Sequence, residues 1–375
     1  MYLRRLVICI FLPLGFLAFS VQASNLNQTM SAIADEMVRI YPLIVAKREL
    51  SQQEYQALQQ SVHSLVKHFH AAQNDIQQRS ETYAVSYKLV LQHLDKIEKA
   101  FKQQRPEFVR RQLYSLGPIC ASCHTQDTAL RSVFHDAPRS QFHDDFAYAE
   151  FNYFTRNYAQ AIKYFDKFLR NSANKTELEI ISPLQRLITI YTQIHNSPDI
   201  AAKQLSEYKN IKSHTRATSK QLDHWIKGLK ELNALKVQQF EAMDFKTLES
   251  YVRRFIGEDD HASAELFSTP EDEVKRVWLR GQLFHYLNSN PPKQQIPTIL
   301  YWLSLCDRSV GYSFNISFAD LFLKECIVSH NKHPYARHCL AEYEKFIEYS
   351  YSGSGGIFVP PDIEDELVEL KALLK

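Results

Sequence analysis

The stretch Cys120-Ala121-Ser122-Cys123-His124 predicts more about the fold and chemistry of this 375-residue chain than any other. It is a C-x-x-C-H run, the pattern through which haem c is attached covalently to a protein. Two thiols three residues apart lie about one helical turn from each other, so both can bond to vinyl groups on one porphyrin edge. The histidine that follows presents an imidazole nitrogen to the iron. We therefore predict that Cys120 and Cys123 bind haem c and that His124 is its proximal ligand.

Other uses of two cysteines at this spacing fit the sequence less well. A thioredoxin-like redox pair would follow a β-strand, and no strand pattern precedes Cys120. A zinc site would need a second cysteine or histidine pair at a usual distance, and the sequence has none. A disulfide between the two neighbours is the remaining alternative. Because the C-x-x-C-H run occurs once, we expect one haem.

The first 23 residues have the pattern of a secretory signal peptide. Arg4 and Arg5 precede an apolar run from Leu6 to Phe19, and a small-residue cleavage site ends at Ala23. An uncleaved anchor is the alternative, but the apolar run of about 14 residues is shorter than the ~20 needed to span a bilayer. No other segment is apolar enough to form a membrane span. We therefore predict a periplasmic protein, which also suits a haem attached outside the cytoplasm.

The charge of the chain excludes some classes of partner. The sequence has 44 basic and 42 acidic residues, and two of the arginines belong to the predicted signal. The formal net charge of the mature chain is therefore zero, and we expect no nucleic-acid partner. Any charged docking surface should be a local patch.

Composition predicts an all-helical protein. Only nine glycines occur in 375 residues, while Leu, Ala, Gln, Lys and Glu are frequent. The length is sufficient for two domains after the signal, which we place at residues 24–135 and 140–375.

Four helical stretches lead up to the C-x-x-C-H run. The first covers residues 33–44, and the second opens with a capping box from Ser51 to Glu54. The third covers residues 83–97, and the fourth begins near Pro106. Each presents one apolar stripe, and the short links between them predict antiparallel neighbours in a bundle.

This order, with the C-x-x-C-H run late in the fourth helix, resembles the class II c-type cytochromes (the cytochrome c-prime and c556 group). The resemblance covers residues 25–130 and implies an antiparallel four-helix bundle carrying haem c. The sequence departs from the family at Gly117-Pro118, which we expect to break the fourth helix just before Cys120.

The resemblance also suggests a sixth iron ligand. In six-coordinate members a methionine on the first helix binds the iron, and Met37 lies on the apolar face of the first predicted helix here. Packing in the core is the alternative role for Met37. Other possible ligands in this half of the chain are Met30, His63, His68, His70 and His93. A five-coordinate iron that binds small gases is the remaining option.

From Phe142 onward the chain resembles a tetratricopeptide repeat (TPR). Ala149 and Ala161 are small residues twelve positions apart, each followed by an aromatic residue four positions later, and the turn between the two repeat helices is expected at residues 157–161. We predict a TPR-like α-solenoid over residues 140–375, with an irregular helical domain as the alternative. Further helices are expected at 184–194, 200–208, 271–288, 296–306, 317–330, 334–350 and 363–374, the last capped by Asp362.

Three cysteines remain outside the signal and the haem pair. In an oxidising compartment one disulfide and one free thiol is the simplest arrangement of Cys306, Cys326 and Cys339, and the sequence leaves the pairing open. Cys326 and Cys339 could join two helices across the turn at 331–334. Three nearby histidines at 330, 333 and 338 have the mixed spacing of a polar helix end rather than of a metal site.

Together these features predict a monohaem c-type cytochrome that carries single electrons and is not an enzyme. The repeat region would dock a redox partner protein. A haem-based gas binder or sensor with a five-coordinate iron is the main alternative. A dihaem peroxidase would need a second C-x-x-C-H run, and a scaffold whose haem only stabilises the fold is a further alternative.

Overall fold

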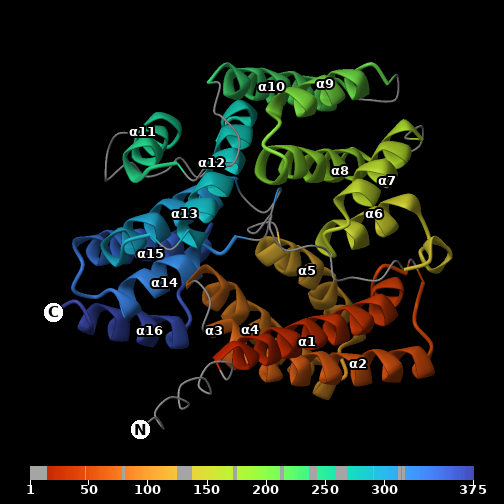
Figure 1. The fold of residues 1–375 in the computed structure, drawn as a ribbon, viewed down its shortest axis with the longest axis horizontal. Helices are drawn as coiled ribbons and strands as arrows, with labels where there is room; N and C mark the ends of the chain where they lie inside the picture. Colours follow the sequence, from red (N-terminus) through yellow and green to blue (C-terminus); the bar gives the residue numbers. More distant parts are fainter. Residues whose placement is uncertain are drawn as a thin grey trace, which may run out of the picture.

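The computed structural model describes the backbone of residues 15–46, 48–77, 81–124, 137–171, 175–211, 215–235, 243–257, 268–289, 291–310, 314 and 317–375. Side chains are described for the same residues except 15–27, 77, 81–86, 89, 107 and 117–124. Within these ranges the chain folds into sixteen α-helices and one two-stranded hairpin (Figure 1). The prediction of an all-α protein is confirmed.

The four helical stretches predicted before the C-x-x-C-H run are all present, and a short helix is added between two of them. The first five helices are α1 (Gly15–Ile44), α2 (Gln52–Ala71), α3 (Gln73–Gln77), α4 (Glu81–Lys102) and α5 (Pro106–His124). The capping box is confirmed, because the Ser51 hydroxyl accepts from the Glu54 backbone N–H and the Glu54 carboxylate accepts from Ser51. α1 packs against α2 and α5, α2 packs against α4, and α4 packs against α5.

The expected break in α5 at Gly117-Pro118 is wrong, because the backbone is helical from Pro106 to His124. A proline inside a helix removes one backbone donor and crowds the preceding turn, but it leaves the other hydrogen bonds of the helix in place. The same tolerance is visible at Pro42 in α1 and Pro183 in α8 (Glu177–Thr189).

The next helices pack as sequential neighbours. They are α6 (Asp145–Phe154), α7 (Tyr158–Arg170), α8, the π-helix η2 (Ile190–Ile194), α9 (Pro198–Lys209) and α10 (Arg216–Ala234), preceded by the 3-10 helix η1 (Arg139–Gln141). Ala149 and Ala161 are both fully buried, as predicted for close contact between α6 and α7. The turn between these helices spans 155–157 rather than 157–161. Residues 158–161 already belong to α7, whose amphipathic pattern extends through them.

The C-terminal third contains the other helices. They are α11 (Phe245–Phe255), α12 (Pro270–Asn288), α13 (Ile296–Val310), α14 (Ala319–Ser329), α15 (Pro334–Ser350) and α16 (Pro361–Ala372), with the 3-10 helix η3 (Lys293–Gln295) before α13. Strands β1 (Ser352–Gly353) and β2 (Gly356–Ile357) form an antiparallel hairpin before α16. The prediction that Asp362 caps the last helix is wrong. Pro360 is the N-cap, and Asp362 lies in the first turn, where a carboxylate also interacts favourably with the helix dipole.

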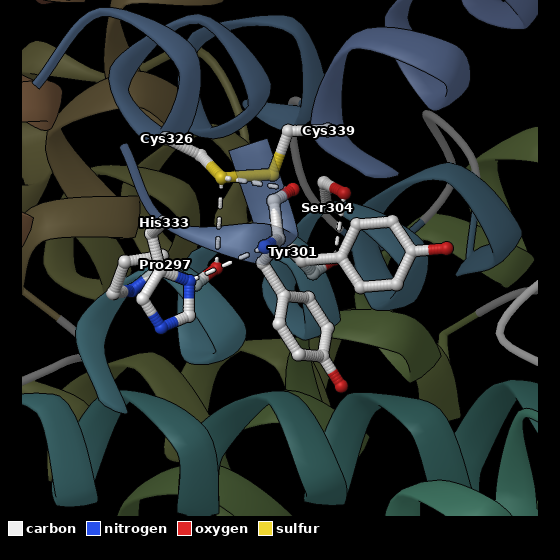
Figure 2. The surroundings of a disulfide bond; sticks show 7 residues. Pro297, Tyr301, Ser304, Cys326, His333 and Cys339 are labelled. Carbon is white, nitrogen blue, oxygen red and sulfur yellow. Dashed lines mark hydrogen bonds between the residues drawn. A yellow bond between two sulfur atoms is a disulfide. The ribbon is translucent and has the colours of Figure 1, made fainter. Parts of the chain in front are cut away.

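The disulfide left open by the sequence joins Cys326 of α14 to Cys339 of α15. Figure 2 shows it beside Pro297 and Tyr301 of α13, and Cys326 Sγ lies 3.7 Å from the Pro297 carbonyl oxygen. Among the cysteines whose side chains the structure describes, Cys306 is a free, buried thiol.

The C-terminal helices pack against the N-terminal ones. Lys88 Nζ of α4 lies 2.6 Å from Glu325 Oε2 of α14, and α4 also packs against α12. Figure 1 shows α5 at the middle of this arrangement, between α1 and α6, both of which it contacts. One hydrophobic cluster extends from Ile33 to Phe314, and a second lies within residues 232–370. The predicted boundary at residues 135–140 falls inside the first cluster and stays a prediction.

Candidate haem-attachment site

The C-x-x-C-H run lies at the C-terminal end of α5, in helical backbone. The α-carbons of Cys120 and Cys123 are therefore about one helical turn apart, the spacing that attachment to one porphyrin edge requires. His124 is the last residue of the helix. The side chains of these three residues are outside the described part of the chain.

Packing and hydrogen bonds on two sides fix the turns of α5 that precede the C-x-x-C-H run. Leu113 and Leu116 are fully buried. Arg110 donates one hydrogen bond to the Arg48 carbonyl at 3.1 Å and another to the Ala46 carbonyl, which ties the start of α5 to the end of α1. These contacts hold the helix that carries the motif in a defined orientation.

On its other flank, α5 is tied to α4 through His93. His93 Nε2 lies 2.6 Å from the Gln112 carbonyl oxygen and 2.9 Å from Ser115 Oγ. Burial lowers the pKa of His93, which favours the neutral imidazole. The Nε2 atom of His93 is thus engaged with α5 itself, which makes His93 a weaker candidate for the iron ligand.

α1 and α5 run antiparallel. Arg110, near the start of α5, donates to the carbonyl of Ala46, which follows the C-terminal end of α1, and the two helices pack against each other. The C-terminal half of α5 therefore faces earlier turns of α1. Met37 lies on one of those turns, one helical turn before Tyr41, and is 3% exposed.

The other predicted ligands differ from Met37 in burial. His63 has a 79% exposed side chain and lies 3.1 Å from the Glu98 carboxylate. His70 is exposed, and His68 is half-buried. Met30 is partly buried against the same core. Among the described candidates, Met37 is the buried thioether on a helix that packs against α5. A thioether and an imidazole are a known ligand pair for haem c iron, so this donor set fits the group.

A buried ion pair next to this region was missed in the sequence. Arg186 Nε of α8 lies 3.0 Å from Glu150 Oε1 of α6, and both side chains are at least nine-tenths buried. Arg186 also donates to the Phe314 carbonyl, and its guanidinium carbon lies 5.2 Å from the Tyr153 ring centre. Burial and the negative charge of Glu150 raise the pKa of Tyr41 well above its ordinary value. The sequence contained one indication of this ion pair, because Glu150 is the only charged residue in the run 146–154.

The described chain contains no group of three His, Cys, Asp or Glu side chains that could hold a metal ion. In agreement with the predicted polar helix end, His333 is the N-cap of α15, and its Nδ1 accepts from the Tyr335 backbone N–H at 3.3 Å.

Comparison with known proteins identifies no relative of this chain. No protein-family model, curated protein or solved structure shows significant similarity to this chain.

Proposed function

We propose that this chain is an exported monohaem c-type cytochrome that carries single electrons. The observation that carries the proposal is the C-x-x-C-H run in helical backbone at the end of α5. Cys120 and Cys123 would hold one haem c, and His124 would ligate its iron. The haem, when bound, supplies the one-electron chemistry, and the protein supplies ligation, burial and orientation.

We further propose Met37 as the sixth ligand. Its burial on α1, and the antiparallel packing of α1 on α5, support this choice. The exposed positions of His63 and His70 and the contacts of His93 with α5 make these histidines weaker candidates. Methionine and histidine together would raise the reduction potential relative to two histidines.

The proposed architecture has two parts. Residues 24–135 would form an antiparallel four-helix bundle, which the packing of α1, α2, α4 and α5 supports. Residues 140–375 would form a TPR-like solenoid that docks a redox partner protein. The sequential pairing of α6 with α7, α9 with α10 and α13 with α14 supports this part.

Export to the periplasm is proposed from the signal-like residues 1–23. The Cys326–Cys339 disulfide supports it, because disulfides persist in oxidising compartments. No helix of the described chain combines the length and apolar character needed to cross a bilayer.

Visible spectra of the purified protein test the proposal. The wild type should show a sharp low-spin α band when reduced and a weak far-red band when oxidised. Met37→Leu keeps the volume of the side chain but removes the sulfur, so it should abolish the far-red band and lower the reduction potential. Met30→Leu is the matched control and should leave both unchanged.

A different spectrum would overturn the electron-carrier proposal. High-spin bands that Met37→Leu does not alter, and that shift when carbon monoxide is added, would indicate a five-coordinate gas-binding iron.

A further inference from the structure

Three exposed apolar residues lie on the adjoining segments where α15 meets the C-terminal hairpin. Tyr349 at the end of α15 is 48% exposed, Ile357 in β2 is 56% exposed, and the next residue, Phe358, is 77% exposed. Single exposed apolar residues are ordinary on a protein surface, but several large ones on adjoining segments point to an interaction site. We call Tyr349, Ile357 and Phe358 the C-terminal tip.

Backbone and side-chain hydrogen bonds hold the C-terminal tip together. The Phe358 N–H donates to the Tyr351 carbonyl at 3.0 Å, and Ser352 Oγ donates to the Tyr349 carbonyl at 3.2 Å. β1 pairs with β2 through Ser352 and Ile357. The hairpin therefore folds back on the end of α15, and the residues of the C-terminal tip lie on a hydrogen-bonded backbone. A preformed anchor loses little conformational entropy on binding, and buried aromatic anchors often dominate interface energies.

The surroundings of the C-terminal tip are acidic. Residues 344–375 include seven acidic and three basic side chains. Two of the acids are neutralised locally: Glu344 pairs with Lys371 at 2.7 Å, and Glu366 pairs with Lys324 at 2.5 Å. The exposed acids that form no ion pair within the described chain are Glu348, Asp362, Glu364, Asp365 and Glu369.

These acids flank the tip in the chain. Glu348 directly precedes Tyr349, and Asp362 follows Phe358 by four residues at the start of α16. An apolar centre with a charged rim is the usual arrangement of a protein interface. The negative charge of this rim favours a partner with a positively charged surface and repels acidic surfaces.

We propose that the C-terminal tip is the docking site for a partner protein with an apolar pocket flanked by lysine or arginine side chains. The inference rests on the docking role proposed above and names the chemistry of the partner. Phe358, the most exposed of the three residues, would enter the pocket, and the carboxylates of the first turns of α16 would pair with its basic rim.

Photo-crosslinking in cells that make the protein tests this proposal. Phe358 is replaced by the photo-crosslinker p-benzoylphenylalanine, and in a matched control the same group replaces Leu178 of α8, which is 81% exposed. We expect position 358, but not 178, to form a crosslink to one protein, through a peptide rich in lysine or arginine. The triple variant Asp362→Asn/Glu364→Gln/Asp365→Asn should reduce that yield by about tenfold, because the rim charges are removed.

Three results would overturn the proposal. They are a yield at position 358 no higher than at position 178, crosslinks only to a second copy of the chain or to lipid, and equal yields with and without the three acids. Far-UV circular dichroism and thermal unfolding show whether each variant is folded. Covalent haem is measured separately, so a basic partner captured by a haem-free protein would contradict the redox function and leave the docking inference standing.

Discussion

Tyr41 of α1 packs edge-on against Phe154 of α6, with ring centres 4.7 Å apart. Phe142 and Phe151 complete the aromatic cluster at 6.2 and 5.9 Å from the Tyr41 ring. The helices before the C-x-x-C-H run and the helices after it thus share a core. We infer that the N-terminal helices depend on α6 for part of their stability.

Tyr41→Ala should destabilise the whole protein. Removing a fully buried aromatic ring leaves a cavity and costs about 3–5 kcal/mol, of which the ring pairs account for roughly 1 kcal/mol. We expect α1–α5 and α6–α10 to unfold in one transition at lower urea concentration. Tyr349→Ala, at a 48% exposed position, is the control and should change the midpoint little. Two separate transitions in the wild type would contradict a shared core.

The Glu150–Arg186 pair should be sensitive to the loss of either charge. Glu150→Gln leaves the Arg186 guanidinium buried without its counter-ion, which typically costs about 3–5 kcal/mol. Glu150→Met combined with Arg186→Met should recover much of the loss, because neither charge then remains buried. Urea unfolding of the single and double variants measures both effects.

Glu207→Gln provides the exposed counterpart of this experiment. Glu207 pairs with Arg170 at 3.2 Å, but both side chains are about half exposed, so we expect a loss of at most ~1 kcal/mol. A Glu150→Gln variant as stable as Glu207→Gln would show that the buried pair does not contribute as proposed.

The disulfide should stabilise the C-terminal helices. Cys326 and Cys339 are 13 residues apart, and closing a loop of this size contributes roughly 3 kcal/mol through the unfolded chain. Reduction of the wild type should therefore lower its thermal unfolding midpoint. Cys326→Ala/Cys339→Ala should be less stable from the start and insensitive to reductant. Equal melting of the oxidised and reduced wild type would contradict the expected contribution.

His93 should make stability depend on pH. Its folded-state pKa is lowered by burial and by nearby Lys96, so below about pH 6.5 the unfolded chain takes up a proton that the folded protein resists. The stability contributed by neutral His93 is complete above that pH and is lost as pH falls toward the lower folded pKa. Urea unfolding between pH 5 and 8 should show a steeper acid loss in the wild type than in His93→Gln. His70→Gln, at an exposed position, should keep the wild-type profile.

Local signals in the sequence predicted much of the fold. Ser51 and Glu54 marked the start of α2, and Pro106 in the first turn marked the start of α5. The apolar periodicity placed most other helices within a few residues. Helices α10 and α11 were not identified, although Thr215 and Asp244 cap them in the ordinary way.

Features that depend on distant residues were missed or mispredicted. Glu150 and Arg186 are 36 residues apart, so their pairing depends on how the tertiary fold brings α6 and α8 together. The one local sign of it in the sequence is a single charged residue in an apolar run. Pro118 looked like a helix end because the local rule for proline does not include the packing of α5 between α1, α4 and α6. The motif residues of the candidate site could be read directly, since C-x-x-C-H is local. The burial that favours Met37 over the histidines required the structure.

The intact mass of the purified, denatured mature protein, produced together with a c-type cytochrome maturation system, tests the central claim most directly. We predict the mass of a chain beginning at Ser24 plus one haem, with the haem lost in Cys120→Ala/Cys123→Ala and retained in Cys306→Ala. The Cys326–Cys339 disulfide accounts for the loss of two hydrogens. A chain that carries no haem, or that has instead lost four hydrogens because Cys120 and Cys123 also form a disulfide, would contradict the account.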